Sequence, residues 1–458
     1  MGMIAPLDSA FLIQEAREHP MHVGGLQLFH TPAGADDDYV GELYRELLQY
    51  TDVAPMFARR PRNPVESVGN FWWQTEADVD IEYHVRHSAL PRPGRVRELL
   101  ELVSRLHGSL LDRHRPLWEY HLIEGLNDGR FASYAKCHHA LADGISLTRR
   151  VLRSCSIDPD SRGMPPMWTP DEDSPAVVAP KRRAGNPVET FRNAGRTLMG
   201  FRGMGSMLYE YGRAAIKDQT AVLPYEAPRS MLNKPITGSR RVAAQSWDIA
   251  RVLTVAKARG ITLNDMVLAM SAGALRRYLI ANDALPGEPL IASVPVSMRS
   301  SSSRAAGSGG EGNSITFVLC NLATHLDNPD DRLEVITSSM RATKAVMADR
   351  PGLQLAAMGV LTAIGPAVLT RIPGSSSAPP PYNVLISNVP GPRQRLHWNG
   401  AELEAIYPIS IPTENQALNI TCLSYADHLE FGLVGCRLAV PKLQRLLDYL
   451  EESLQELE

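Results

Sequence analysis

The sequence has few cysteines, no excess of either charge and no apolar run that is both long and free of helix-breaking residues. Its five cysteines form no CxxC pair, and their odd number cannot close a disulfide framework. Cysteine usage therefore favours a reducing compartment. The 47 Lys and Arg nearly balance the 50 Asp and Glu, so the formal net charge of −3 offers no general attraction to nucleic acid phosphates. We expect no nucleic acid partner.

Targeting and membrane-spanning segments are also not indicated. The first 15 residues contain no basic stretch followed by an apolar core, so the sequence does not support a secretory signal. The longest uncharged stretch, residues 351–370, holds Pro366 and three glycines, a composition that disfavours a lipid-facing helix. We expect a buried or interface helix there. With 458 residues, 44% of them hydrophobic, the chain is long enough for two or three folding units.

Strand-like and helix-like segments alternate along residues 1–155. Apolar residues recur at helical or alternating spacing, and a glycine-containing turn predicts a hairpin. The expected elements are a strand over 23–29, helices over 39–50 and 98–111, and hairpin strands over 118–123 and 131–138. This series predicts a first lobe.

Residues 156–235 interrupt the alternation. Residues 156–187 are rich in Pro, Asp, Ser and Arg, as in an exposed connection, and 188–217 regain helical character. A second alternating series then occupies residues 236–458. Its expected elements are helices over 249–258, 263–281 and 441–457 and strands over 290–296, 315–322, 383–387, 417–425 and 428–435. We therefore predict an α/β fold with two lobes, 1–155 and 236–458, each with a mixed sheet, joined by a long linker over 156–235.

The most informative segment is the heptapeptide His138-His139-Ala-Leu-Ala-Asp143-Gly144, at the end of a predicted strand. Because successive strand side chains point to opposite faces, we expect the two histidines to diverge, so that only one of them faces a cleft. A neutral imidazole can accept a proton from an alcohol at cellular pH. Asp143 can hold local backbone or a cationic partner, and Gly144 leaves room for close approach or an unusual φ.

The heptapeptide alone leaves other interpretations open. Two histidines and an aspartate can also bind a metal ion or serve as hydrogen-bonded core residues. On an alternating strand, Cys137 would share a face with His139, which permits a Cys–His nucleophile that forms a covalent acyl-enzyme. A buried, unactivated thiol is the competing interpretation of Cys137.

The heptapeptide matches HHxxxDG, the signature of the CoA-dependent acyltransferase superfamily, which includes chloramphenicol and carnitine acyltransferases and the condensation domains of peptide synthetases. More specifically, nearly the whole chain resembles the bacterial wax ester synthase/diacylglycerol acyltransferase (WS/DGAT) family. Further matching segments, in the expected order, are LDSAF at 7–11, PLW at 116–118, NKPITG at 233–238, ND at 264–265, PVSMR at 295–299 and SNVPGP at 387–392.

This resemblance implies transfer of an acyl group from acyl-CoA to a lipid hydroxyl, with the second histidine of the motif, His139, as general base. It implies a structural role for His138 and an arginine partner for Asp143. The candidate partners are Arg59, Arg60 and Arg299. The implied fold has chloramphenicol-acetyltransferase-like lobes with an active-site tunnel between them. We expect no metal and no permanently bound cofactor, with acyl-CoA as co-substrate.

A tetrahedral intermediate needs a hydrogen-bond donor near its oxyanion, and Asn264 is our candidate. Its amide does not titrate, and Asn264-Asp265 begins a predicted helix, where free N–H groups point outward. The alternative is that the two residues only cap that helix. Asp265 and a strand-to-turn segment are further predicted to bind substrate, the segment as a wall of the tunnel or, alternatively, as a rigid turn. Its candidate residues are Ser387, Asn388, Pro390 and Gly391.

The predicted reaction converts acyl-CoA and diacylglycerol to triacylglycerol and free CoA. Formation of a wax ester from a long-chain alcohol is the alternative, because both acceptors present a hydroxyl on an apolar body. Two other hypotheses are a scaffold that binds lipid or a carrier protein without catalysis, and a peptide-synthetase-like condensation domain. We expect a cytoplasmic protein that collects apolar substrates at the inner membrane face or at lipid droplets. The sequence leaves the oligomeric state open.

Overall fold

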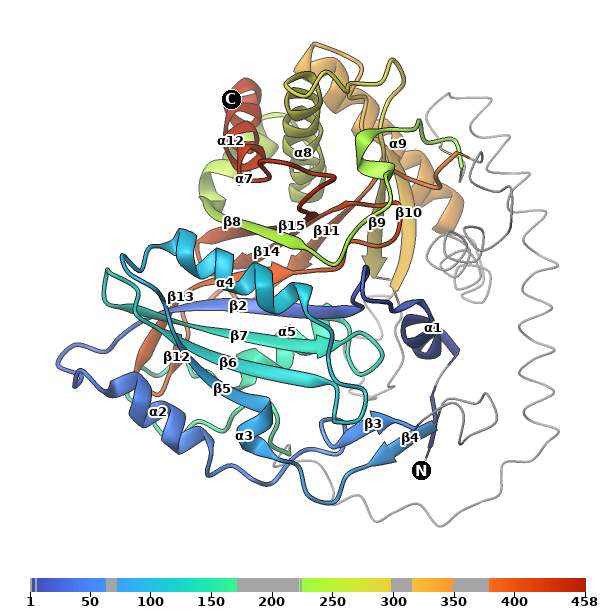
Figure 1. Cartoon of the computed structure of the whole chain (residues 1–458). Helices are drawn as coiled ribbons and strands as arrows, with labels where there is room; N and C mark the ends of the chain where they lie inside the picture. Colours follow the sequence, from blue (N-terminus) through green and yellow to red (C-terminus); the bar gives the residue numbers. More distant parts are fainter. Residues whose placement is uncertain are drawn as a thin grey trace.

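The structure, a computed structural model, describes residues 2–4, 6–62, 72–170, 222, 225–297, 315–348 and 379–458. It contains two large mixed sheets with helices packed on them, and one small sheet (Figure 1). The α/β prediction with two lobes is confirmed. The helical segments predicted over 188–217 and 351–370 lie outside the described residues.

The first large sheet contains β2 (His22–His30), β5 (Val85–Ala89), β6 (Trp118–Glu124), β7 (Arg130–His138), β12 (His397–Trp398) and β13 (Ala401–Ile409). Its order is β12-β13-β2-β7-β6-β5, and all neighbours are antiparallel except β5 and β6. Alternation along β7 sends Phe131, Ala135 and Cys137 into the core on one face and Ala132 and Tyr134 into the core on the other. Both faces of this sheet are therefore buried.

The elements around the first sheet are α1 (Pro6–Gln14), α2 (Tyr39–Leu47), α3 (Ile81–His84), α4 (Val96–Gly108), α5 (Gly144–Arg153), β1 (Gly2–Met3), β3 (Arg59–Pro61) and β4 (Trp72–Thr75). Helices α2 and α5 bury apolar side chains on one face, and α4 packs on the other. Strands β1, β4 and β3 form the small sheet. Helix α1 lies at the edge where β7 ends (Figure 1).

The second large sheet contains β8 (Arg240–Asp248), β9 (Ile291–Ser297), β10 (Ile315–Asn321), β11 (Val384–Pro390), β14 (Leu418–Tyr425) and β15 (His428–Cys436). Its order is β10-β9-β11-β14-β15-β8, with β11 parallel to both of its neighbours and all other pairs antiparallel. The helices α7 (Ile249–Ala258), α8 (Leu263–Ile280), α9 (Pro329–Ala348) and α12 (Arg445–Leu457) lie on the side of this sheet that faces away from the first sheet (Figure 1).

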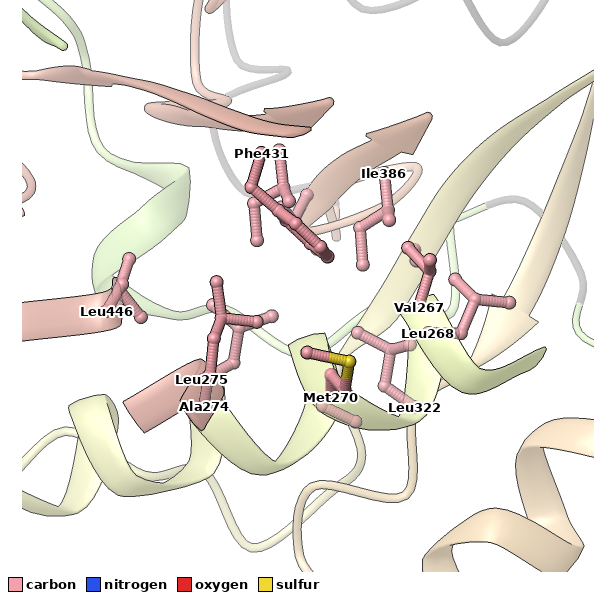
Figure 2. Packing of buried hydrophobic residues seen from close by; sticks show 14 of the residues in the cluster. Val267, Leu268, Met270, Ala274, Leu275, Leu322, Ile386, Phe431 and Leu446 are labelled. Carbon is pink, nitrogen blue, oxygen red and sulfur yellow. The ribbon is translucent and has the colours of Figure 1, made fainter. Parts of the chain in front are cut away.

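Helix α8 is the centre of the second core. Its side chains are buried almost all the way round, since it packs between the sheet and the helices α9 and α12. Val267 and Met270 of α8 lie among the same apolar side chains as Ile386 of β11 and Phe431 of β15 (Figure 2). This packing fixes the direction of α8 and therefore the position of Asn264 in its first turn.

The predicted lobe boundary at residue 236 is wrong for one segment. Strands β12 and β13, over 397–409, come from the second half of the chain but complete the edge of the first sheet beside β2. Pairing with β13 satisfies the backbone N–H and C=O groups along that edge of β2. The first lobe therefore contains one β-hairpin from the second half of the chain, and the two lobes do not simply follow one another in sequence.

The two sheets are also in close contact. A Cβ added to Gly432 of β15 would lie 1.9 Å from the carbonyl oxygen of Pro408 in β13, so only glycine fits there. Between the lobes, the backbone N–H of Val242 in β8 donates to Ser104 Oγ of α4 at 2.9 Å. Side chains of α4 share one apolar cluster with Val242 and Val434 of the second sheet.

Parts of the described ends of the predicted linker are packed against the first lobe. The backbone of Ser156 exchanges two hydrogen bonds with that of His397. Trp168 is fully buried, stacks on Trp118 and donates from Nε1 to the Tyr50 carbonyl at 3.0 Å. The prediction of an exposed connection holds for residues 157–160, 162 and 163 but is wrong for residues 166–169, where an aromatic anchor outweighs the polar, proline-rich composition.

Candidate active site

The HHxxxDG heptapeptide joins the end of β7 to the start of α5. Strand β7 ends at His138, and His139 to Ala142 form a turn. Asp143 is the N-cap of α5, where its side chain accepts a hydrogen bond from the backbone N–H of Ser146 at 2.6 Å. The strand ends between the two histidines, so they do not alternate on it as we expected.

His138 is completely buried, with a hydrogen bond at one ring nitrogen and a carboxylate beside the other. Its Nδ1 accepts a hydrogen bond from the backbone N–H of Ala140 at 3.0 Å, and its Nε2 lies 3.4 Å from the Glu15 carboxylate. Its backbone N–H donates to the Leu117 carbonyl at 3.0 Å. Both sides of the ring are therefore directed at the protein rather than at a substrate.

His139 is half-buried, and its imidazole stacks on the ring of Phe11 with centroids 4.1 Å apart and an interplanar angle of 18°. Its backbone N–H donates to the Met21 carbonyl at 2.9 Å. Of its two ring nitrogens, only Nδ1 is buried without a hydrogen-bond partner among the described residues. This leaves Nε2 as the nitrogen available to a substrate.

The environment of His139 keeps its imidazole neutral. Burial lowers its pKa from 6.5 to about 4; the Asp143 carboxylate and its own backbone act in the opposite direction, and His138 adds to the lowering. At cellular pH the ring therefore carries an unprotonated nitrogen that can accept a proton. The nearby Asp143 charge favours the imidazolium once a proton arrives.

Helix α1 and the residue that follows it supply two acidic groups, Asp8 and Glu15, to the surroundings of the motif. Burial, and then the charge of Asp143, raise the pKa of Asp8 to about 6. Burial also opposes ionisation of Glu15, but His138, the Met21 N–H and Arg113 outweigh it and lower the pKa of Glu15 to about 2. Sequence reasoning used the segment 7–11 only as a family resemblance and assigned no role to Asp8, Phe11 or Glu15. Their spacing of three and four residues places them on one helical face, which is the signal that could have identified them.

Asp143 and Gly144 differ in part from expectation. Asp143 has no arginine partner among the described residues: Arg60 pairs with Glu76, Arg59 forms no ion pair with Asp143, and Arg299 lies outside the described ranges. Its capping bond to Ser146 occupies one carboxylate oxygen instead. Gly144 has no positive φ, so the expectation of unusual backbone is wrong, but a Cβ added there would meet nothing within 4 Å, which leaves open space beside the motif.

Cys137 does not have the properties of a nucleophile. It is fully buried on β7, between Val23 and Trp118 of the neighbouring strands. Burial raises the pKa of its thiol to about 12. His139 lies beyond the end of the strand, so the expected shared face does not exist.

Asn264 and Asp265 occupy the first turn of α8, as predicted. Thr262 is the N-cap, and it forms a capping box with Asp265: Thr262 Oγ1 accepts from the Asp265 N–H, and Asp265 Oδ2 accepts from the Thr262 N–H at 3.0 Å. Asp265 therefore has the capping role. Asn264 is half-buried and takes no part in this cap.

Ser387, Asn388 and Pro390 lie within β11, so the prediction that the strand ends at 387 is wrong. Strand β11 pairs with β9 only at Val384 and Leu385, whereas its other edge follows β14 as far as Pro390. Val389 packs on the apolar cluster of the first sheet, so this end of β11 lies where the lobes meet. Gly391 contacts the Ser424 carbonyl, where a Cβ would lie only 2.2 Å from the oxygen.

The described residues contain no group of three or more His, Cys, Asp and Glu side chains positioned to hold a metal ion. Among the helices of these residues, none combines the length and the apolar character that a membrane span requires.

Comparison with solved structures places this fold in a class. The first condensation domain of the CDA synthetase has a TM-score of 0.56 at 14% identity, with 100% of this chain and 95% of that chain covered. At that identity the likeness concerns the fold alone, which is the two-lobed architecture of condensation domains. The wax ester synthase/diacylglycerol acyltransferase from Marinobacter aquaeolei VT8 is closer, with a TM-score of 0.78 and 41% identity over 100% of this chain and 99% of that one.

Family comparison identifies the chain within that class. The model described as the wax ester synthase/diacylglycerol acyltransferase catalytic domain matches residues 4–267, and the WS/DGAT C-terminal domain matches residues 311–458. A Mycobacterium tuberculosis (strain H37Rv) protein that carries the name of a diacylglycerol O-acyltransferase is 50% identical over 456 residues, with 99% of both chains covered. The chain therefore belongs to the WS/DGAT family, which confirms the resemblance inferred from its motifs.

Proposed function

We propose that this protein transfers the acyl group of acyl-CoA to the free hydroxyl of diacylglycerol, with His139 as general base. The observation that carries the proposal is the state of the His139 imidazole, which is neutral, oriented by Phe11 and free at Nε2 among the described residues. Membership of the WS/DGAT family supports the substrate classes. The names of relatives, such as the diacylglycerol O-acyltransferase of M. tuberculosis, favour diacylglycerol as acceptor.

In the proposed reaction, Nε2 of His139 accepts the proton of the acceptor hydroxyl as its oxygen attacks the thioester carbonyl. A carbon–oxygen bond forms, and the carbonyl electron pair moves onto oxygen. Collapse of this intermediate breaks the carbon–sulfur bond, and the imidazolium returns its proton to the leaving thiolate. The products are triacylglycerol and free CoA, and no acyl-enzyme is required.

Two other residues have proposed roles in this step. Asp143 lies close enough for its charge to favour protonation of His139, so it stabilises the imidazolium that forms with the oxyanion. Asn264 is proposed as the oxyanion donor. Its support is that it stands in the first turn of a rigidly packed helix without being used in the cap.

Formation of wax esters from long-chain alcohols is a second candidate function. The family description names both activities, and the solved relative from M. aquaeolei carries both in its name. Because either acceptor is an apolar molecule with one hydroxyl, we further propose that the protein meets its acceptor at the inner membrane face or at a lipid droplet. Ser387, Asn388, Pro390 and Gly391 are proposed to line the substrate path where the lobes meet.

The test is the initial rate of CoA release from a long-chain acyl-CoA, measured with diacylglycerol and with a long-chain alcohol as separate acceptors. The proposal expects acceptor-dependent thiol release with diacylglycerol, and triacylglycerol as the product identified by mass. A higher rate with the alcohol would favour the wax ester function. No release with either acceptor would favour the non-catalytic scaffold.

A further inference from the structure

Helix α1 and Glu15, the residue that follows it, contact both histidines of the motif. Phe11 lies on the ring of His139, and Glu15, four residues later, lies beside the ring of His138. The backbone N–H of Glu15 still donates to the Phe11 carbonyl at 3.0 Å, so the helical geometry that aligns the two side chains continues to Glu15. A single short helix therefore reaches the whole histidine pair.

The contact between Phe11 and His139 constrains the imidazole. Two nearly parallel rings with centroids 4.1 Å apart leave the imidazole little freedom to rotate about its χ angles. The same contact covers one face of the ring against water. A general base must present its nitrogen within hydrogen-bond reach of the proton that it removes. A ring held in one plane has this reactive orientation more often than a ring that rotates freely.

Glu15 connects to both histidines through a single oxygen. Its Oε1 accepts a hydrogen bond from the Met21 N–H at 3.1 Å and lies 3.4 Å from His138 Nε2. The carbonyl of the same Met21 accepts from the His139 N–H. Thus the carboxylate lies directly beside the ring of one histidine and is linked to the backbone of the other through one residue, Met21.

The carboxylate is itself fixed. The Glu15 side chain is only 3% exposed, and its other oxygen, Oε2, accepts from two guanidinium nitrogens of Arg113 at 2.9 and 3.0 Å. Arg113 also donates to the Leu12 carbonyl of α1 at 2.6 Å. The arginine therefore ties the carboxylate and the end of the helix together, and the charge of Glu15 is balanced where it is buried.

We infer that Phe11 and Glu15 are positioning residues of the acyl transfer, Phe11 by fixing the ring of His139 and Glu15 by fixing His138 and the backbone of His139. The inference rests on the proposed role of His139 as general base. The competing explanation is that α1 only covers and stabilises the first lobe. The two explanations differ in what happens to the proton affinity and orientation of His139 when a single contact is removed.

The first experiment follows the titration of His139 by NMR in histidine-labelled full-length protein, which requires no turnover. The titratable groups that act on the ring are Asp143, the N-cap of α5, and His138, at the end of β7; Asp8 of α1 acts on Asp143, and Glu15, which follows α1, acts on His138. Phe11→Ala removes apolar cover and none of these charges, so the pKa of His139 is expected to rise from about 4 toward its ordinary value. Phe11→Tyr keeps the stacked ring and is expected to restore the wild-type titration.

The matched control is Leu12→Ala, on the neighbouring position of the same helix. Leu12 is buried with Trp73, Leu111, Leu117 and Ala140 in a cluster that does not include Phe11, so this change weakens the docking of α1 beside the motif while the ring of Phe11 stays on the imidazole. It is expected to lower Tm and leave the titration unchanged. If Leu12→Ala shifts the pKa as much as Phe11→Ala does, or if Phe11→Ala shifts nothing, α1 is only a structural cover and the inference is wrong.

The second experiment measures steady-state kinetics of CoA release. Phe11→Ala and Glu15→Gln are each expected to lower kcat by about tenfold or more with KM nearly unchanged, and the acid limb of kcat/KM is expected to move to higher pH in Phe11→Ala. An unchanged kcat in both variants at a temperature where they are folded would overturn the inference. If the wild type shows no acyl transfer at all, the proposed function fails, whereas the NMR result still decides whether Phe11 controls His139.

Discussion

The ring nitrogen Nδ1 of His138 accepts a hydrogen bond from the backbone N–H of Ala140, with the two nitrogens 3.0 Å apart. Because a backbone N–H can only donate, the neutral ring of His138 carries its proton on Nε2, on the side of Glu15. Its neighbour His139 makes no such bond among the described residues and keeps Nε2 free. Two adjacent residues of one type thus have different surroundings, and the first prediction separates them.

His138→Ala is expected to act mainly on folding. The change leaves a cavity and removes the partner of a buried carboxylate, so we expect a loss of about 2 kcal/mol or more in the free energy of unfolding. His138→Asn is the matched variant, because an amide can accept from Ala140 and donate toward Glu15, and it is expected to lose less. Thermal and urea unfolding test this. An alanine variant with unchanged stability and abolished turnover would instead make His138 the catalytic histidine.

Asn264→Ala tests the oxyanion donor. If the side-chain amide stabilises the intermediate, kcat is expected to fall by about 10²-fold with little change in KM. Thr262→Ala serves as control, because it removes the N-cap of the same helix and is expected to cost about 1 kcal/mol of stability without that loss of kcat. An Asn264 variant with normal kcat would leave this residue without a role in the reaction.

Replacement by alanine is expected to lower the stability of the protein at one glycine of the candidate site and to leave it unchanged at another. At Gly391 the added Cβ would lie 2.2 Å from the Ser424 carbonyl oxygen, so Gly391→Ala is expected to destabilise by about 1–3 kcal/mol. At Gly144 the Cβ meets nothing, so Gly144→Ala is expected to keep its Tm. Gly144 belongs to the HHxxxDG motif, and we expect its added methyl group to lower activity by occupying space that substrate uses. A wild-type rate in Gly144→Ala would show that substrate does not use the space beside Gly144.

The sequence predicts those parts of the site that depend on interactions between residues close together in the chain. Helix α8 was predicted at nearly its observed bounds, because its apolar periodicity and its first-turn polar residues are local signals. The motif at the end of β7 was found from residue types and spacing. By contrast, no strand was assigned over 401–409, and nothing local in that segment specifies β2 as its partner.

The contribution of α1 was missed for the same reason. Phe11 and Glu15 contact residues more than 100 positions later in the chain, and such contacts are set by packing rather than by local propensity. The linker composition was also misleading at Trp168, since one buried aromatic ring determines where a polar segment lies. Local patterns thus predicted the elements and the motif, whereas the pairing of distant segments decided the neighbours of His139.

Glu430 gives a prediction for stability against pH. It is fully buried on β15 at the junction of the lobes, where Ser246 donates to its Oε2, and Tyr407 hydrogen-bonds Ser246 at 3.0 Å. Burial, with the charges of Glu404 and Asp427 adding to it and Ser246 opposing it, raises the pKa of Glu430 to about 8. The folded protein therefore holds a proton that the unfolded chain, with a glutamate pKa of 4.5, releases.

This stabilising contribution is complete below about pH 4.5 and is lost as pH rises through about 8. Wild-type Tm is accordingly expected to fall from pH 5 to pH 8.5 by more than that of Glu430→Gln, whose amide does not titrate. Differential scanning calorimetry of the two proteins over this range is the measurement. Parallel Tm curves would show that Glu430 is ionised in the folded protein.

The central claim is that the imidazole of His139 removes the proton of the acceptor hydroxyl. The measurement that tests it most directly is CoA release from a long-chain acyl-CoA with diacylglycerol, comparing wild type with His139→Ala at equal folded concentration. We expect the variant to lose at least about a hundredfold in kcat, with an unchanged unfolding transition. A variant that releases CoA and forms triacylglycerol at a rate near that of the wild type would contradict the account.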